Sequence, residues 1–253
     1  SQCISALLVI ICICRLPEDI RLKPSLTMVD PVLMRRILLI GLPAGLQFIT
    51  FDLSNLLVQS GINSFGDITV AAWAAYFKAD SLTWMVSGAF GVAITTFVGQ
   101  NLGCKQVDRA RKGVKTALML ALSCTAVLMI PILIYAEPVV AFFNPKPEVV
   151  AYGSLLLRYI TPFYLLCCFN QIYSGALRGA GNSKAPMIIM LSSFVAFRQV
   201  YLFIMSRICN EIIPIAMSYP AGWMLCATLT TIYYHKAKLS ANRLVEDIPE
   251  KEK

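Results

Sequence analysis

The sequence predicts an all-α membrane protein that folds as a bundle of six transmembrane helices. Hydrophobic residues make up 57% of the 253 residues and charged residues 14%, whereas an average soluble domain has about 25% charged residues. Several apolar runs reach the roughly 20 residues that a helix needs to cross the hydrocarbon core. The net charge of +8 follows the loops between these runs, so we expect the lipid bilayer as a partner and no nucleic acid.

A basic loop within residues 97–115 fixes the expected orientation. Two long apolar runs flank it, and it carries five basic residues within eleven positions: Lys105, Arg109, Arg111, Lys112 and Lys115. Lys and Arg accumulate on the cytoplasmic side of membrane proteins. Most of the 22 basic residues then fall on the inner side, and the outer loops hold Lys146 and Arg207. We therefore expect a multi-pass protein of the plasma (inner) membrane.

The elements follow from this pattern in chain order. We expect residues 1–14 to be the end of a truncated transmembrane helix and residues 15–31 to be a cytoplasmic linker. Residues 32–235 form the six-helix lobe, with spans at about 31–62, 70–100, 114–136, 149–176, 187–206 and 212–234. Residues 137–148, which contain three prolines, read as a loop. Residues 236–253 are rich in charged side chains, and this composition predicts a disordered cytoplasmic tail.

The residue types disfavour an enzyme. The nine cysteines lie mostly inside apolar runs, none forms a CxxC pair, and the chain has one histidine. A zinc set is therefore not expected, and we predict no metal centre and no organic cofactor. The sequence also lacks the HExxH and GxSxG motifs of metalloproteases and serine hydrolases.

Five ionisable residues fall inside the expected spans: Asp52, Lys78, Asp80, Arg158 and Arg198. Charges at membrane depth are costly and mark functional sites by default. Each lies about eight to eleven residues from the outer end of its span, so all five are expected roughly 12–16 Å deep. This common depth predicts a shared internal cavity or a buried ion-pair network. The alternative is that two acids and three bases neutralise one another and only hold the bundle together.

Helical spacing groups polar residues near these charges. Three such faces are expected on separate spans: Asp52, Asn55, Gln59 and Asn63; Asp80, Trp84, Ser87, Gly91 and Thr95; and Ser192, Ala196 and Gln199, with Arg198 beside them. Asn170 and Tyr173 share a face on a fourth span, whereas Lys78 lies about 200° around its helix from Asp80. Gly88, Gly91, Gly99 and Gly103 have the spacing of close helix contacts.

Three stretches resemble a known family. They are GLPAGLQ at residues 41–47, VGQNLG at residues 98–103 with the basic run that follows, and SGALRGAGNSKAPM at residues 174–187. Together they are similar to the multidrug and toxic compound extrusion (MATE) transporters. The resemblance covers about residues 38–235 and follows the C-terminal six-helix lobe of that family. It implies that the N-terminal lobe is missing here and is a partner from the same chain.

The resemblance implies a secondary active efflux transporter. Such proteins export cationic amphiphilic compounds by H⁺ or Na⁺ antiport, with alternating access of two lobes. It implies cation coupling at Asp52, with a bound Na⁺ ion there as one version, and the second intramembrane carboxylate, Asp80, is expected to share this role. The expected cavity-lining residues are Gln47, Asn55, Gln59, Lys78, Trp84, Arg158, Asn170, Tyr173, Arg198 and Gln199.

Two alternatives stay open at this point. A lipid-linked oligosaccharide flippase of the same superfamily would line its cavity with basic residues that bind pyrophosphate, and Lys78, Arg158 and Arg198 are candidates for that role. A structural membrane protein that transports nothing is the alternative from another class.

Overall fold

The computed structural model describes residues 2–15, 31–209 and 211–237. These residues belong to two units, Ser1–Leu39 and Ile40–Lys253, and each is described by itself. The first unit contains the apolar helix α1 (Gln2–Cys14) and the start of α2. Most of the predicted linker at 15–31 and of the predicted tail at 236–253 lies outside the described residues.

The second unit is a bundle of long helices. It holds the rest of α2 (Pro31–Asn63), followed by α3 (Asp67–Gly103), α4 (Val107–Ile134), α5 (Ala136–Phe143), α6 (Pro147–Ile160), α7 (Tyr164–Gly179), α8 (Lys184–Met190), α9 (Arg198–Ile208), α10 (Ile212–Ala216) and α11 (Ser218–Lys236). Five segments of the described chain are long and apolar enough to cross a membrane: Asp67–Gly103, Val107–Ile134, Pro147–Gly179, Lys184–Ile208 and Ile212–Lys236. The 33-residue α2 occupies the remaining predicted span.

Two of the spans contain irregular turns. A 3₁₀ turn at Thr161–Phe163 joins α6 to α7, and Pro162 within it has no N–H to continue the helical ladder. A π-helix at Leu191–Phe197 joins α8 to α9 and ends directly before Arg198. Its i→i+5 pattern changes the angular phase of the residues that follow. The prediction of a loop at 137–148 is wrong in part, because the first half of this segment folds as α5.

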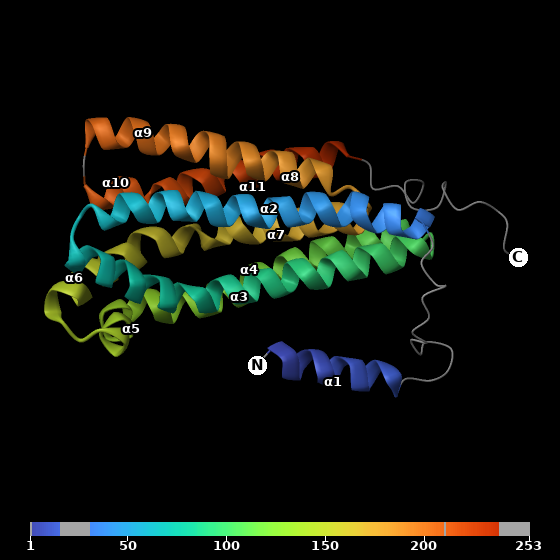
Figure 1. Ribbon diagram of the computed structural model, residues 1–253, viewed down its shortest axis with the longest axis horizontal. Helices are drawn as coiled ribbons and strands as arrows, with labels where there is room; N and C mark the ends of the chain where they lie inside the picture. Colours follow the sequence, from blue (N-terminus) through green and yellow to red (C-terminus); the bar gives the residue numbers. More distant parts are fainter. Residues whose placement is uncertain (1, 16–30, 210, 238–253) are drawn as a thin grey trace, which may run out of the picture. The chain divides into compact units, whose positions relative to one another are not determined.

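Successive spans run in opposite directions. Figure 1 shows the α3–α4 turn, the α7–α8 turn and the end of α11 at the same end of the second unit. That end carries Lys105, Lys184 and Lys236, and we call it the basic end. The turn after α7 uses Gly181 at φ +79°, a conformation that costs glycine little.

The core contains two groups of buried side chains. One packs aromatic residues of α3, α7 and α11, among them Trp73, Tyr164 and Trp223. The other lies toward the basic end and includes Val98, Val114 and Ile172. Because the first group is rich in polar-tipped aromatic rings, it can surround a polar group inside the bundle.

Helices α3 and α7 approach closely at small residues. A Cβ atom at Gly175 or Gly179 would come within 3.0 Å of a backbone carbonyl oxygen of α3. Of the four glycines expected at close contacts, Gly91 and Gly99 face α7 within 3.5 Å of an added Cβ, as predicted. Gly88 and Gly103 have nothing within 4 Å, so for these two the prediction is wrong.

Candidate functional site

Asp80 is the buried acid of the bundle interior. It lies on α3 with 8% of its surface exposed, and its Oδ2 accepts a hydrogen bond from the hydroxyl of Tyr164 on α7. Its Oδ1 is buried without a hydrogen-bond partner among the described residues. A buried carboxylate oxygen without a partner is costly, so this atom is a candidate acceptor for a cation or a proton.

A small aromatic pocket surrounds this carboxylate. It has a volume of about 90 Å³ and lies between α2, α3, α7 and α11; its lining is Phe51, Asn55, Trp73, Tyr76, Phe77, Asp80, Ser81, Trp84, Tyr164, Tyr219 and Trp223. Pockets for drug-sized ligands usually measure about 300–1,000 Å³. The pocket is therefore the right size for a small cation and too small for an amphiphilic drug.

The pocket walls are held by stacked rings. Phe51 stacks on Trp84 with ring centroids 5.7 Å apart, and Tyr164 packs against Trp223 at 4.8 Å. Aromatic faces carry negative potential that attracts cations. Combined with one carboxylate, these faces form a site suited to positive charge.

Arg198 lies next to the pocket, on the far side of the lining residues Asn55 and Tyr219. Its side chain is fully buried, and Nη1 donates to Oδ1 of Asn55 at 3.1 Å and to Oγ of Ser54 at 3.3 Å. Its guanidinium carbon lies 4.3 Å from the ring centroid of Tyr219, which lines the pocket. Nε and Nη2 have no partner among the described residues. The positive charge is therefore fixed against neutral groups and an aromatic ring.

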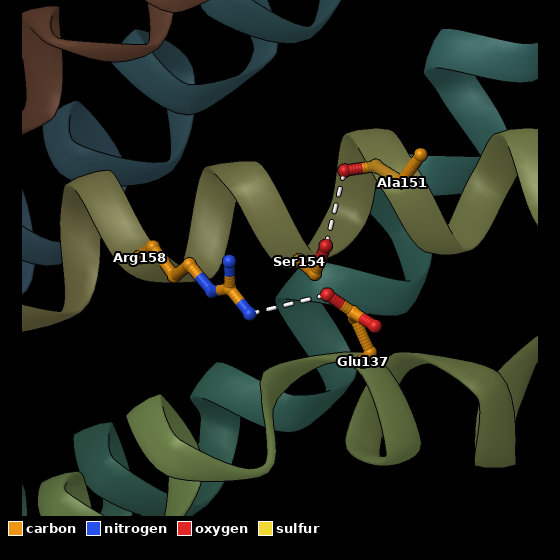
Figure 2. Close-up of polar contacts among 4 residues, drawn as sticks. All are labelled: Glu137, Ala151, Ser154 and Arg158. Carbon is orange, nitrogen blue, oxygen red and sulfur yellow. Dashed lines mark hydrogen bonds and ion pairs between the residues drawn. The ribbon is translucent and has the colours of Figure 1, made fainter.

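The predicted common layer of five charges is not one internal site. Asp52, Lys78 and Arg158 are exposed on the bundle, and only Asp80 and Arg198 are buried. Figure 2 shows Arg158 of α6 pairing with Glu137 of α5, with Nη2 3.1 Å from Oε1. Within the described chain, no ion pair joins any two of the five. Within the described residues the five charges therefore form no single enclosed site, because similar depth does not determine which way each helix face points.

The predicted faces differ in outcome. On α3, Asp80, Ser87 and Gly91 are buried and Trp84 is half-buried, so this face points inward as predicted. Among the α2 side chains that the structure describes, Ser54, Val58 and Ile62 are buried. The predicted stripe on α2 lies beside them, with Asn55 and Gln59 half-buried and Asp52 exposed.

The other predicted lining residues whose side chains the structure describes do not line the pocket at Asp80. Asn170 accepts hydrogen bonds from Ser174 and Thr230 in a separate buried cluster. Tyr173 stacks on Tyr234 with centroids 4.4 Å apart. Gln59 bonds to Asn63 on its own helix, and the amide nitrogen of half-buried Gln199 has no partner in the described chain. The side chain of Gln47 lies outside the described residues. Among the predicted lining residues, the pocket brings Asn55 and Trp84 to Asp80.

Sequence reasoning missed most of the aromatic wall. Trp73, Tyr76, Tyr164, Tyr219 and Trp223 line the pocket, and none was predicted as a site residue. A signal was present, because Trp73 and Tyr76 lie seven and four residues before Asp80 and so share its helix face.

Comparison with known proteins identifies the family. The MatE family model matches residues 43–204. The chain belongs to the MatE family. MatE relatives include the probable multidrug resistance protein YoeA of Bacillus subtilis, 26% identical over 206 residues, which cover 81% of this chain and 44% of YoeA. The multidrug resistance protein MdtK of Proteus mirabilis is 30% identical over 183 residues, which cover 71% of this chain and 39% of MdtK.

Solved MatE structures share the fold. A mutant of the Vibrio cholerae MATE transporter VcmN superposes with a TM-score of 0.79 at 18% identity, covering 88% of this chain and 52% of that protein. The chain thus spans about half the length of the MatE relatives it matches. Membership of the MatE family and the five helices long and apolar enough to cross a membrane indicate that this is a multi-pass membrane protein.

Proposed function

We propose that this chain is the C-terminal six-helix lobe of a secondary transporter that exports cationic amphiphilic compounds in exchange for H⁺ or Na⁺. The observation that carries the proposal is the buried carboxyl group of Asp80, which keeps one oxygen unpaired inside a small aromatic pocket. The relatives are named multidrug resistance proteins. Small-molecule cations are therefore the proposed substrates.

Asp80 is the proposed coupling residue. A carboxyl group there can take up a proton, or its oxygen without a hydrogen-bond partner can bind Na⁺ inside the pocket. Because the pocket joins helices α2, α3, α7 and α11, its occupancy can favour one packing of the lobe over another. A ligand shifts such an equilibrium by its difference in affinity for the two states.

The partner in this mechanism is a second lobe of the same protein. The chain spans about half of its relatives, and transporters of this kind alternate access by rocking two repeats around a midplane site. The missing half is the surface against which this lobe would move. Asp52 is exposed on α2, so a coupling role for it requires a partner surface from outside the described chain.

The charge of the pocket favours cations over a pyrophosphate-linked lipid. Asp80 is the charged residue in the pocket lining. Of the three basic residues that a flippase would use, Arg158 already pairs with Glu137, Lys78 is exposed, and Arg198 lies behind Tyr219.

Dye efflux tests the proposal. Cells that express the full-length protein are loaded with ethidium, and efflux is followed for the wild type, Asp80→Asn and Glu148→Gln. Glu148 is an exposed acid at the start of α6 and serves as the matched control. We expect efflux to be lost in Asp80→Asn alone. If wild-type cells do not export the dye, or if Asp80→Asn exports it normally at every pH, the proposal is wrong.

A further inference from the structure

A groove of about 620 Å³ lies between α4 and α11, and its lining includes residues near the start of α4 and the end of α11 at the basic end. Its rim carries three nitrogen-bearing side chains: Arg111 and Lys115 of α4 and His235 of α11. Its wall continues along α4 with three apolar residues, Leu118, Met119 and Leu122. The groove lies apart from the Asp80 pocket and shares no lining residue with it.

The floor of the groove is aromatic and firmly packed. Tyr173 of α7 stacks on Tyr234 of α11, with ring centroids 4.4 Å apart at an interplanar angle of 22°. His235 meets the edge of Tyr173, with centroids 5.8 Å apart. Because α7 packs against both α4 and α11, it holds the two walls at a fixed separation. Tyrosine is a residue that membrane proteins place at the lipid headgroup level.

The rim carries positive charge that the described residues neutralise only weakly. Arg111 and Lys115 are one helical turn apart, so they share a face of α4. Arg111 has one weak ion pair with Asp108 at 3.9 Å, and the two side chains are 53% and 90% exposed. Surface pairs of this kind contribute little. No acidic residue of the described chain lines the groove, so its rim is complementary to an anion.

The order of the lining residues distinguishes a lipid from a soluble anion. Lys115 lies eight residues into α4, and the apolar residues follow it toward the middle of the span. At 1.5 Å per residue, this places Lys115 about 12 Å from the helix start and Leu122 about 10 Å farther on. A ligand with an anionic head at the rim would thus have its tail beside the apolar residues, and a phospholipid has this arrangement of head and tail.

We propose that this groove binds a phospholipid with a net negative headgroup. Its phosphate lies between Arg111 and Lys115, and an acyl chain runs along Leu118, Met119 and Leu122 above the tyrosine floor. Basic pockets between transmembrane helices are a known way of holding anionic lipid headgroups. The lipid would tie the start of α4 to the end of α11.

Native mass spectrometry of the full-length protein tests this assignment directly. Detergent-purified protein is titrated with phosphatidylglycerol or phosphatidylcholine, and the retained lipid is counted. We expect phosphatidylglycerol to be retained in preference. Each basic residue near anionic lipid contributes about a fivefold gain in affinity, so Arg111→Gln/Lys115→Gln should bind phosphatidylglycerol about 25-fold more weakly. The charge-preserving Arg111→Lys/Lys115→Arg should retain it.

Matched controls separate the groove from general surface attraction. Lys105→Asn/Lys184→Gln removes two basic residues that are exposed at the same end but outside the groove, and asparagine tolerates the positive φ of Lys105. Equal loss in both double variants would overturn the proposal, as would equal retention of the two lipids. Competition by free glycerol phosphate at the same concentration would identify a soluble anion instead.

A third arm tests whether the chain itself fills the groove. Residues 238–253 contain four acidic residues and follow directly after Ala237, which lines the groove. If phosphatidylglycerol binds only after these residues are deleted, the occupant is the tail and the lipid proposal fails. Since the readout is bound lipid, the result is independent of whether the protein exports cations.

Discussion

The hydroxyl group of Tyr164 donates a hydrogen bond to Oδ2 of Asp80 and so joins α7 to α3 inside the bundle. The same tyrosine ring packs against Trp223 of α11, with centroids 4.8 Å apart. One side chain therefore links the acid to two further helices. A change in the charge of Asp80 would therefore alter the packing of these helices directly.

Removal of that hydrogen bond is expected to destabilise the lobe. Tyr164→Phe keeps the ring but leaves both oxygens of Asp80 without a hydrogen-bond donor among the described side chains. An unsatisfied buried polar group costs about 1–3 kcal/mol. Thermal unfolding in detergent should show this loss, and the double variant Tyr164→Phe/Asp80→Leu should recover part of it. A Tyr164→Phe protein as stable as the wild type would contradict the contact.

The close approach of α3 and α7 leads to a second prediction, which concerns stability. Gly175→Ala and Gly179→Ala each push a methyl group against a backbone carbonyl of α3, and overpacking of this kind costs about 1–3 kcal/mol. Gly88→Ala on the same α3 meets open space and is the control; it should be neutral or stabilise by about 0.5–1 kcal/mol. Unfolding measurements on the three variants check the order, and a Gly88→Ala protein less stable than Gly179→Ala would refute it.

Arg198 provides a third prediction. Ser54 and Asn55 are its hydrogen-bond acceptors, so Ser54→Ala/Asn55→Leu leaves a buried guanidinium without either. Such an uncompensated charge costs about 3–5 kcal/mol. Adding Arg198→Met removes the charge and should restore most of the stability. If the triple variant is no more stable than the double variant, Arg198 is not fixed by these two acceptors.

The ion pair in Figure 2 should contribute little. Arg158 and Glu137 are 54% and 60% exposed, and exposed pairs are worth about 0–1 kcal/mol. A double-mutant cycle with Arg158→Gln and Glu137→Gln measures their coupling by unfolding. A coupling energy well above 1 kcal/mol would show that the pair is less solvated than its exposure indicates.

The sequence predicts the spans well and the site only in part. Hydropathy and length locate five spans that the structure confirms, because the bilayer demands long apolar helices. The face of α3 around Asp80 is also correct, since α3 is an uninterrupted α-helix. The inward face of a regular helix can be read from spacing alone.

The failures have local causes. Helical spacing puts Ser192, Ala196 and Gln199 on one face with Arg198 beside it, but Ser192 and Ala196 are exposed, Gln199 is half-buried and Arg198 is fully buried. The π-helix at Leu191–Phe197 shifts the phase there, and no residue pattern announces it. The aromatic wall was missed for another reason: rings from α7 and α11 reach Asp80 only through tertiary packing, which helical spacing within one span cannot reveal.

Dye-binding measurements show directly whether cation coupling passes through Asp80. The affinity of the purified full-length protein for ethidium is measured against pH and against Na⁺ concentration. We predict that acidification or added Na⁺ weakens dye binding in the wild type and in Glu148→Gln, by the 5- to 150-fold that couplings of about 1–3 kcal/mol produce. Asp80→Asn should bind the dye with an affinity that neither condition changes. If Asp80→Asn keeps the wild-type response to both pH and Na⁺, coupling does not pass through Asp80.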